Sequence, residues 1–133
     1  MNANEKFLEG RLVFLRKPDV QADVLEGEWH SWFNDPRVTR YLIHGVFPVS
    51  RDDEAAVIRR DMSNPGNLIL AVVDKESGSQ IGVISLKNID WINRCAEIGM
   101  VIGRKRPAGS ALEAMALLAK HAFDRLNLER IYG

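Results

Sequence analysis

The stretch of this chain best suited to chemistry is a basic loop that runs from an apolar segment into a helix. Ile98–Ile102 is a short apolar run of a length typical of a strand, and Arg104–Arg106 follow it closely. A helical apolar pattern then begins near Gly109. Because a helix start carries unpaired N–H groups and the positive end of the helix dipole, this junction predicts an anion site. Gly109 lets a ligand approach the backbone, and the small Ser110 and Ala111 leave the first turn uncrowded.

The helix that follows the loop is predicted to bury one face against the rest of the domain. Its apolar residues recur at helical spacing, at Leu112, Met115, Ala116, Ala119, Phe123 and Leu126.

The N-terminal part of the chain supplies the first elements around this loop. Polar and apolar residues alternate over Arg11–Arg16, which predicts a strand. Asp19 is placed to cap a helix that runs toward Trp32, and Asp35 with Pro36 predicts the start of another helix.

The middle of the chain predicts a helix followed by a hairpin. Ser50 and Asp53 suit a capping box for a helix through Met62. Leu68–Asp74 and Ile81–Leu86 are apolar runs joined by a glycine-containing turn, which predicts a β-hairpin.

The strand of Glu97 is reached through a predicted turn over residues 88–94. Asn93 is the residue of this turn expected to take a positive φ. A last strand is predicted near Arg130, after the long helix.

Composition limits the class of protein. A chain of 133 residues with 46% hydrophobic content predicts one core and one domain over residues 1–133. Eighteen basic and eighteen acidic residues argue against nucleic acid as a partner, since nucleic-acid binding usually leaves a basic footprint. The sequence has no apolar run of membrane-spanning length and no signal-peptide core, so we expect no membrane partner and a cytoplasmic location.

The sequence does not predict a metal site. Cys95 is the only cysteine, which excludes an internal disulfide and a thiolate cluster. His30, His44 and His121 show no spacing typical of metal ligands.

The basic loop resembles a known family motif. Arg106-x-x-Gly109-x-Ala111 matches the pattern Gln/Arg-x-x-Gly-x-Gly/Ala of the GCN5-related N-acetyltransferases, the GNAT superfamily. The segments Ala96–Gly99 and Leu126–Ile131 also resemble the RimJ/RimL-like branch of that family, at the expected distances from the loop.

The resemblance implies an α/β (α+β) GNAT fold, a mixed central sheet flanked by helices in the order β-α-α-β-β-β-α-β. In that family a further helix and two strands follow. We therefore expect a C-terminally incomplete N-acetyltransferase domain, either a fragment of a longer chain or a homodimer whose partner covers the open sheet edge. Tyr132 stands too early in the motif to be assigned the acid role that a later tyrosine has in the family.

The resemblance also implies acetyl-CoA as co-substrate. Its pantetheine arm would bond to the backbone of Met100, Val101 and Ile102, because the family's strands splay apart there. Pro107 has no N–H, so the loop offers one donor fewer than usual. The pyrophosphate would be held by Arg104, Arg106, Ala108, Gly109, Ser110 and Ala111.

The implied reaction is attack of a neutral amine on the thioester carbonyl. It needs a base, because alkyl amines are protonated at neutral pH. Glu97 is the candidate, since it begins the strand that would carry the cofactor and its apolar neighbours would disfavour its charged form. A surface pairing with Arg94 or with a neighbouring strand accounts for Glu97 equally well, and Asp35 is already explained as a helix cap.

The acceptor cleft is expected beside the first two helices. The segment from Trp29 through Pro36 resembles a RimJ/RimL-like pattern in which these helices form one wall of that cleft. An aromatic wall of Trp29, Trp32, Phe33 and Tyr41 would suit a sugar ring or an extended peptide better than a polyamine. Asn88 is a further candidate for lining the cleft. The alternative is that these aromatic side chains only fill a core.

We therefore predict an N-acetyltransferase that moves an acetyl group from acetyl-CoA to a primary amine, namely a protein N-terminus, an amino sugar or a nucleotide-linked amino sugar. Two alternatives stay open. One is a CoA-binding domain without turnover, and the other is a regulatory domain that binds phosphate or a nucleotide at the same helix start.

Overall fold

The computed structural model describes residues 5–27, 29, 32, 50–103 and 108–133. Its described elements are, in chain order, β1 (Leu8–Glu9), β2 (Val13–Arg16), the π-helix η1 (Val20–Leu25), α3 (Arg51–Ser63), β3 (Leu68–Asp74), β4 (Gln80–Asp90), β5 (Cys95–Ile102), α4 (Ser110–Asp124) and β6 (Arg130–Tyr132).

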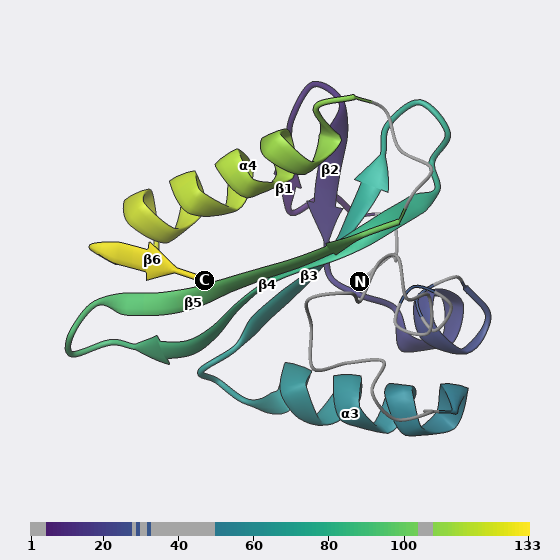
Figure 1. Ribbon diagram of the computed structural model, residues 1–133, viewed down its shortest axis with the longest axis horizontal. Helices are drawn as coiled ribbons and strands as arrows, with labels where there is room; N and C mark the ends of the chain where they lie inside the picture. Colours follow the sequence, from purple (N-terminus) through teal and green to yellow (C-terminus); the bar gives the residue numbers. More distant parts are fainter. Residues whose placement is uncertain (1–4, 28, 30–31, 33–49, 104–107) are drawn as a thin grey trace.

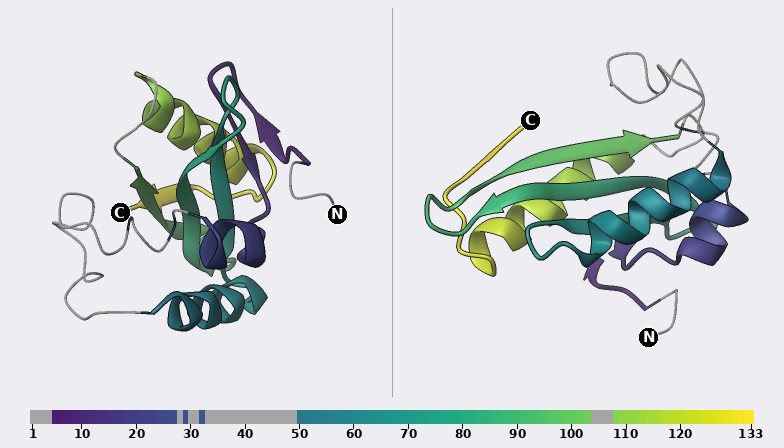
Figure 2. Two further views of the ribbon diagram at one scale, coloured as in Figure 1. Left: turned by 90° about the vertical axis from the view of Figure 1, so that its right-hand side faces the viewer. Right: turned by 90° about the horizontal axis from the view of Figure 1, so that it is seen from below.

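The described strands form one mixed six-stranded sheet in the order β1-β2-β3-β4-β5-β6. Neighbouring strands are antiparallel except β5 and β6, which run parallel because α4 crosses between them. Figures 1 and 2 show α4 on one face of the sheet and α3 on the other. The α/β architecture predicted from the sequence is therefore confirmed, with β1 as an additional edge strand that was not predicted.

The capping box predicted for α3 is confirmed. The Ser50 hydroxyl accepts a hydrogen bond of 3.1 Å from the N–H of Asp53, and the Asp53 carboxylate accepts one of 3.4 Å from the N–H of Ser50. The helix ends at a cap on Asn64, at the Asn64-Pro65-Gly66 segment.

The helix predicted after Asp19 is shorter than expected. The Asp19 side chain accepts from the Ala22 N–H at 3.2 Å, and the π-helix that it caps ends at Leu25. Trp29 and Trp32 are helical as well. The helix predicted from Asp35 lies outside the described residues.

The turn between β4 and β5 differs from the prediction. β4 continues to Asp90, so Asn88 is a strand residue, with a φ of 53°. The Asp90 carboxylate holds the turn by accepting from the N–H groups of Ile92 and Asn93, at 3.0 and 2.8 Å. The positive φ expected at Asn93 falls instead on Arg94, at 58°, where the chain enters β5.

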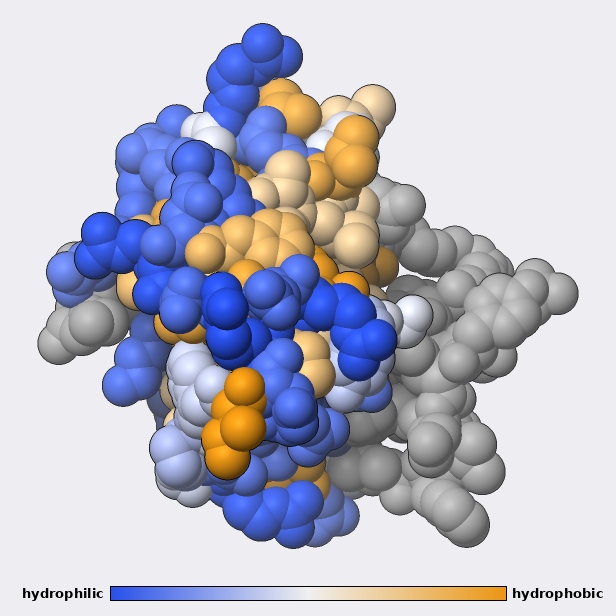
Figure 3. All heavy atoms as spheres, turned by 90° about the vertical axis from the view of Figure 1, so that its left-hand side faces the viewer, coloured by the Kyte–Doolittle hydropathy of each residue, from blue (hydrophilic) through white to orange (hydrophobic). Residues whose placement is uncertain are grey.

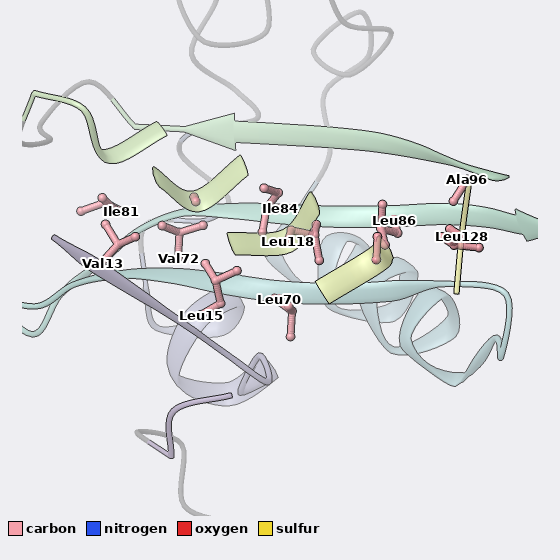
Figure 4. Packing of buried hydrophobic residues seen from close by; sticks show 12 residues of the cluster. Val13, Leu15, Leu70, Val72, Ile81, Ile84, Leu86, Ala96, Leu118 and Leu128 are labelled. Atoms are coloured by element: carbon pink, nitrogen blue, oxygen red, sulfur yellow. The ribbon is translucent and has the colours of Figure 1, made fainter. Parts of the chain in front are cut away.

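Side chains alternate between two cores, one on each face of the sheet. The core beneath α4 contains alternate residues of β2, β3 and β4 (Figure 4): Val13, Leu15, Leu70, Val72, Ile84 and Leu86. The core on the α3 face consists of Val24, Trp29, Trp32, Ala55, Ile58, Ile69, Val83 and Val101.

α4 buries a different face from the predicted one. Ala114, Leu118 and Ala122 are fully buried, whereas Leu112 is 75% exposed and Phe123 is 44% exposed. The predicted face was wrong because this helix carries apolar residues on more than one side, so periodicity alone did not select the buried side. The alanines let the helix backbone approach the sheet closely.

Candidate active site

β5 has an open backbone edge. It pairs with β4 from Cys95 to Ile102, but with β6 only through Cys95–Glu97. Within the part of the chain that the structure describes, β6 pairs with this edge no further than Glu97, and Gly133, which follows β6, lies against the Ile98 carbonyl. Backbone N–H and C=O groups of an unpaired edge seek partners, and this edge includes Met100, Val101 and Ile102, the residues predicted to bind the pantetheine arm.

α4 begins without a side-chain cap. Gly109 is its N-cap residue, in the left-handed conformation at φ 86°. A Cβ at this position would meet Leu12 Cδ1 at 3.5 Å, an ordinary contact, so the glycine is required by its φ rather than by crowding. Ala108 and Gly109 are exposed, which leaves the positive end of the helix dipole accessible to an anion.

The first turn of α4 also contains a carboxylate, Glu113. Its Oε1 atom accepts hydrogen bonds from the N–H groups of Leu12 and Val13, at 2.7 and 3.0 Å. The carboxylate therefore satisfies backbone donors of β2 and holds the helix start against the sheet. Arg104 and Arg106, the basic residues expected beside this helix start, lie outside the described residues.

β5 ends in a close contact with Trp32. The Gly103 N–H donates to the Ile81 carbonyl at 2.8 Å, and a Cβ on Gly103 would lie 2.7 Å from Nε1 of Trp32. The indole therefore packs against the backbone at the point where β5 leads into the loop before α4.

The tryptophans do not form an exposed wall. Trp29 is 0% exposed and Trp32 is 6% exposed, because both indoles fill the core between the sheet and the α3 side. The prediction that they face an acceptor cleft is therefore wrong. Phe33 and Tyr41, the other aromatic residues of that prediction, lie outside the described residues.

Glu97 is exposed, which corrects the expectation of an apolar environment. Its neighbours in sequence, Ala96 and Ile98, belong to the core beneath α4. Strand alternation therefore places the Glu97 side chain on the opposite face, away from them. The predicted ion pair with Arg94 does not form either, since Arg94 contacts Glu129 at 3.5 Å and the Asn127 carbonyl at 2.8 Å.

Glu97 belongs to a row of polar side chains that the sequence did not reveal. It is the register partner of Lys87 on β4 and of Tyr132 on β6. The Lys87 ammonium lies 3.5 Å from the Asp61 carboxylate of α3, which confirms that the row lies on the α3 face. Only the register of three strands brings these residues together.

Asn88, a predicted acceptor contact, follows Lys87 on β4. This residue is exposed, and its N–H donates to Asn67 Oδ1 at 3.4 Å.

A pocket of about 290 Å³ opens elsewhere, beside the start of β3. None of the predicted site residues lines it; its walls are Glu5, Lys6, Phe7, Lys17, Met62, Asn67, Leu68, Ile69 and Leu70.

Neither a metal cluster nor a membrane span occurs in the described ranges. No group of three or more His, Cys, Asp or Glu side chains there is placed to hold a metal ion. No helix there combines the length and the hydropathy needed to cross a bilayer.

The sequence is similar to two proteins that are named as N-acetyltransferases. The chain is 36% identical over 121 residues to the uncharacterized N-acetyltransferase p20 of Bacillus licheniformis, a match that covers 88% of this chain and 66% of p20. It is 31% identical over 103 residues to the putative ribosomal N-acetyltransferase YdaF of Bacillus subtilis, covering 74% of this chain and 55% of YdaF. The chain thus spans about two thirds or less of the length of these relatives.

The fold matches as well. Spermidine N-acetyltransferase from Vibrio cholerae, solved in complex with CoA and spermine, superposes with a TM-score of 0.77 at 21% identity, covering 90% of this chain and 69% of that one. The family model described as an acetyltransferase (GNAT) domain matches residues 13–133, most of the sequence. This chain therefore belongs to the GNAT acetyltransferase family.

Proposed function

We propose that this chain is an N-acetyltransferase domain that moves an acetyl group from acetyl-CoA to a primary amine. The observation that carries the proposal is the uncapped helix start at Gly109, which the chain reaches directly after the strand β5. A ligand with a peptide-like arm and a pyrophosphate can use both features, since the arm needs backbone partners and the pyrophosphate suits the helix dipole.

The cofactor would lie along β5 and end at α4. The backbone of Met100, Val101 and Ile102 would bond to the pantetheine arm, and residues 108–111 would face the pyrophosphate. We propose that Arg104 and Arg106 add positive charge there. Family membership supports this assignment, and the Vibrio cholerae neighbour was solved with CoA bound.

Glu97 is proposed as the base. Its carboxylate would take a proton from the acceptor ammonium, directly or through water, and so free the nitrogen lone pair. The nitrogen then attacks the thioester carbonyl carbon, the C–N bond forms and the C–S bond breaks. The attacking nitrogen then loses its second proton, and the CoA sulfur leaves with the electron pair of the C–S bond and takes up that proton, so the products are an amide and the CoA thiol. Exposure of Glu97 keeps this carboxylate accessible to an acceptor and to water.

The acceptor amine is proposed to bind on the α3 face of β4 and β5, next to Glu97, with Asn88 at its margin. Gly99 is exposed on this face and has no side chain, so the surface beside Glu97 is recessed. A Cβ on Gly99 would meet Ser85 Oγ at 3.6 Å. A protein N-terminus, an amino sugar and a nucleotide-linked amino sugar remain the candidate acceptors.

Calorimetric titration with acetyl-CoA tests the binding half of the proposal. Gly109→Glu should abolish binding, because it places a bulky anionic side chain at the helix start. Gly78→Glu is the matched control: Gly78 also has a positive φ, 72°, in an open turn with nothing within 4 Å of its Cβ position. Equal affinity for acetyl-CoA in the wild type and Gly109→Glu would place the cofactor elsewhere, and preference for ATP would favour a nucleotide-binding domain.

Acetyl transfer to a mixed panel of primary amines tests turnover. Release of the CoA thiol should require both an amine and the Glu97 carboxylate, so Glu97→Gln should lower the rate by at least about a hundredfold, the usual contribution of a general base. Binding of acetyl-CoA with no transfer to any amine would instead indicate a CoA-binding domain without turnover.

A further inference from the structure

A second charged side chain lies beside Glu97 on β6. Cys95 and Glu97 of β5 pair with Arg130 and Tyr132, respectively. Ile131 packs against the core beneath α4, so Arg130 and Tyr132 lie on the opposite face, with Glu97. Figure 3 shows the end of the molecule that carries β6, whose surface contains both hydrophilic and apolar residues.

Arg130 is held in place but keeps its donors available. Its Cζ atom lies 5.4 Å from the centroid of the Tyr132 ring, a cation–π arrangement that fixes the guanidinium over the ring. Arg130 is exposed and forms no ion pair with any other described residue. A guanidinium has five N–H donors in a planar fork, which suits a carboxylate or a phosphate.

Glu97 is therefore flanked by a cation from each neighbouring strand. Lys87 on β4 is paired with Asp61 and is 40% exposed, and Arg130 lies on β6. Because Asp61 already pairs with Lys87, Arg130 is the cation here without a described carboxylate partner. A polyamine with one ammonium at Glu97 would bring another of its charges near Arg130, and like charges across an interface are unfavourable. An amine with an attached anionic group would instead have a partner for each charge.

Building on the N-acetyltransferase function proposed above, we propose that the acceptor is a small primary amine that bears an anionic group, a carboxylate or a phosphate. Glu97 receives the ammonium, and Arg130, as a specificity-determining residue, binds the anionic group. The anchor lies on the strand after α4, so the acceptor would extend from its place on β4 and β5 onto β6.

Titration of the CoA-loaded chain with matched acceptor pairs tests this assignment, because CoA without an acetyl group gives a complex that cannot turn over. Comparing the affinities of glucosamine 6-phosphate and glucosamine tests whether a phosphate is recognised. Comparing those of glycine and glycinamide tests whether a carboxylate is recognised. In at least one pair the anionic member should bind about tenfold more tightly, as expected for one bidentate charge-assisted contact. Spermidine should bind more weakly than that anionic member.

Two arginine variants distinguish binding of the anionic group by Arg130 from a general effect of positive charge. Arg130→Gln should reduce the preference within the pair to about twofold or less, whereas Arg125→Gln, an exposed arginine after α4, should leave it unchanged. Comparable binding of spermidine, no preference in either pair, or a preference that survives Arg130→Gln would each overturn the proposal. Failure of CoA to bind would count against the proposed function alone, since the same pairs titrated without CoA still measure the Arg130 anchor.

Discussion

Oε1 of Glu113 lies 2.7 Å from the backbone nitrogen of Leu12 and accepts its hydrogen bond. The same oxygen accepts from Val13 at 3.0 Å, so the first turn of α4 is tied to the beginning of β2, about a hundred residues earlier in the chain. The contact is close: a Cβ on Gly10 would overlap the Glu113 carboxylate. A side chain next to the proposed pyrophosphate site is thus used to hold the site in place.

Glu113→Ala should lower the free energy of unfolding by about 1.5–3 kcal/mol, because it removes a charged acceptor from two partly buried N–H groups. Chemical denaturation measures this change. Glu129→Ala is the control, since the Glu129 side chain is exposed and makes only a long contact with Arg94, while its backbone hydrogen bond to the Arg94 carbonyl is kept. An unfolding free energy unchanged by Glu113→Ala would show that water replaces the carboxylate at no cost.

Asp23→Ala should be among the most destabilising substitutions in this chain. Arg16 and Asp23 form a bidentate ion pair at 2.8 and 2.7 Å, with side chains only 7% and 4% exposed, and Asp23 also accepts from the Asp19 N–H. Removing the carboxylate leaves a buried guanidinium without its counter-charge, which costs about 3–5 kcal/mol.

Thermal and urea unfolding of the Asp23→Ala variant measure that loss. The exposed pair of Lys120 and Asp124 offers the comparison, and Lys120→Ala should leave the unfolding midpoint unchanged. If Asp23→Ala lowers the free energy of unfolding no more than Lys120→Ala does, the Arg16 guanidinium must move into solvent when its partner is removed.

His121 should make stability fall in mild acid. Burial, followed by the charge of Arg125, lowers the pKa of His121 from its ordinary value of 6.5, and the ring packs edge-on against Phe7. Folding therefore favours the neutral imidazole, so the unfolded chain binds the proton first. Stability is full above the unfolded pKa of about 6.5 and is lost as pH falls through it toward the lower folded pKa.

Unfolding free energies measured at about pH 7.5 and about pH 5.5 test the histidine, because this interval spans its unfolded pKa. The loss of stability between the two should be smaller in His121→Gln than in the wild type. Arg125→Gln should also reduce it, since it removes the second cause of the shift. Equal losses in all three proteins would assign the acid sensitivity to other groups.

Gly103→Ala should destabilise the end of β5. Its new methyl group would lie 2.7 Å from the Trp32 indole nitrogen and 3.3 Å from the Ile81 carbonyl, so the indole must move, at a cost of about 1–3 kcal/mol. Gly99→Ala, four residues earlier and within β5, meets only Ser85 Oγ at 3.6 Å and should be tolerated. Tryptophan fluorescence should change in Gly103→Ala alone, and identical spectra and stabilities for the two variants would contradict the contact.

Several features of this protein follow from the sequence by itself. The Ser50–Asp53 capping box, the β3–β4 hairpin and the helix start at Gly109 are local, since each depends on residues a few positions apart. The anion site proposed at α4 belongs to the same class, because a loop glycine and the first helical turn define it together. Such features need no knowledge of what packs against them.

Other features depended on contacts between distant segments. Leu112 and Phe123 have the spacing of a buried face, yet the fit of Ala114, Leu118 and Ala122 against the sheet determined which side of α4 is covered. Aromatic residue type did not distinguish a cleft wall from a core, and the indole of Trp29 proved to be fully buried.

Glu97 shows most clearly why the tertiary structure was needed. Its apolar neighbours in sequence point to the opposite face of β5, whereas its neighbours in space, Lys87 and Tyr132, are ten and thirty-five residues away along the chain. A strand's side chains alternate between faces, and a shift of one residue in register would exchange them. The surroundings of this carboxylate were therefore decided by how β4, β5 and β6 pair, which requires the assembled sheet.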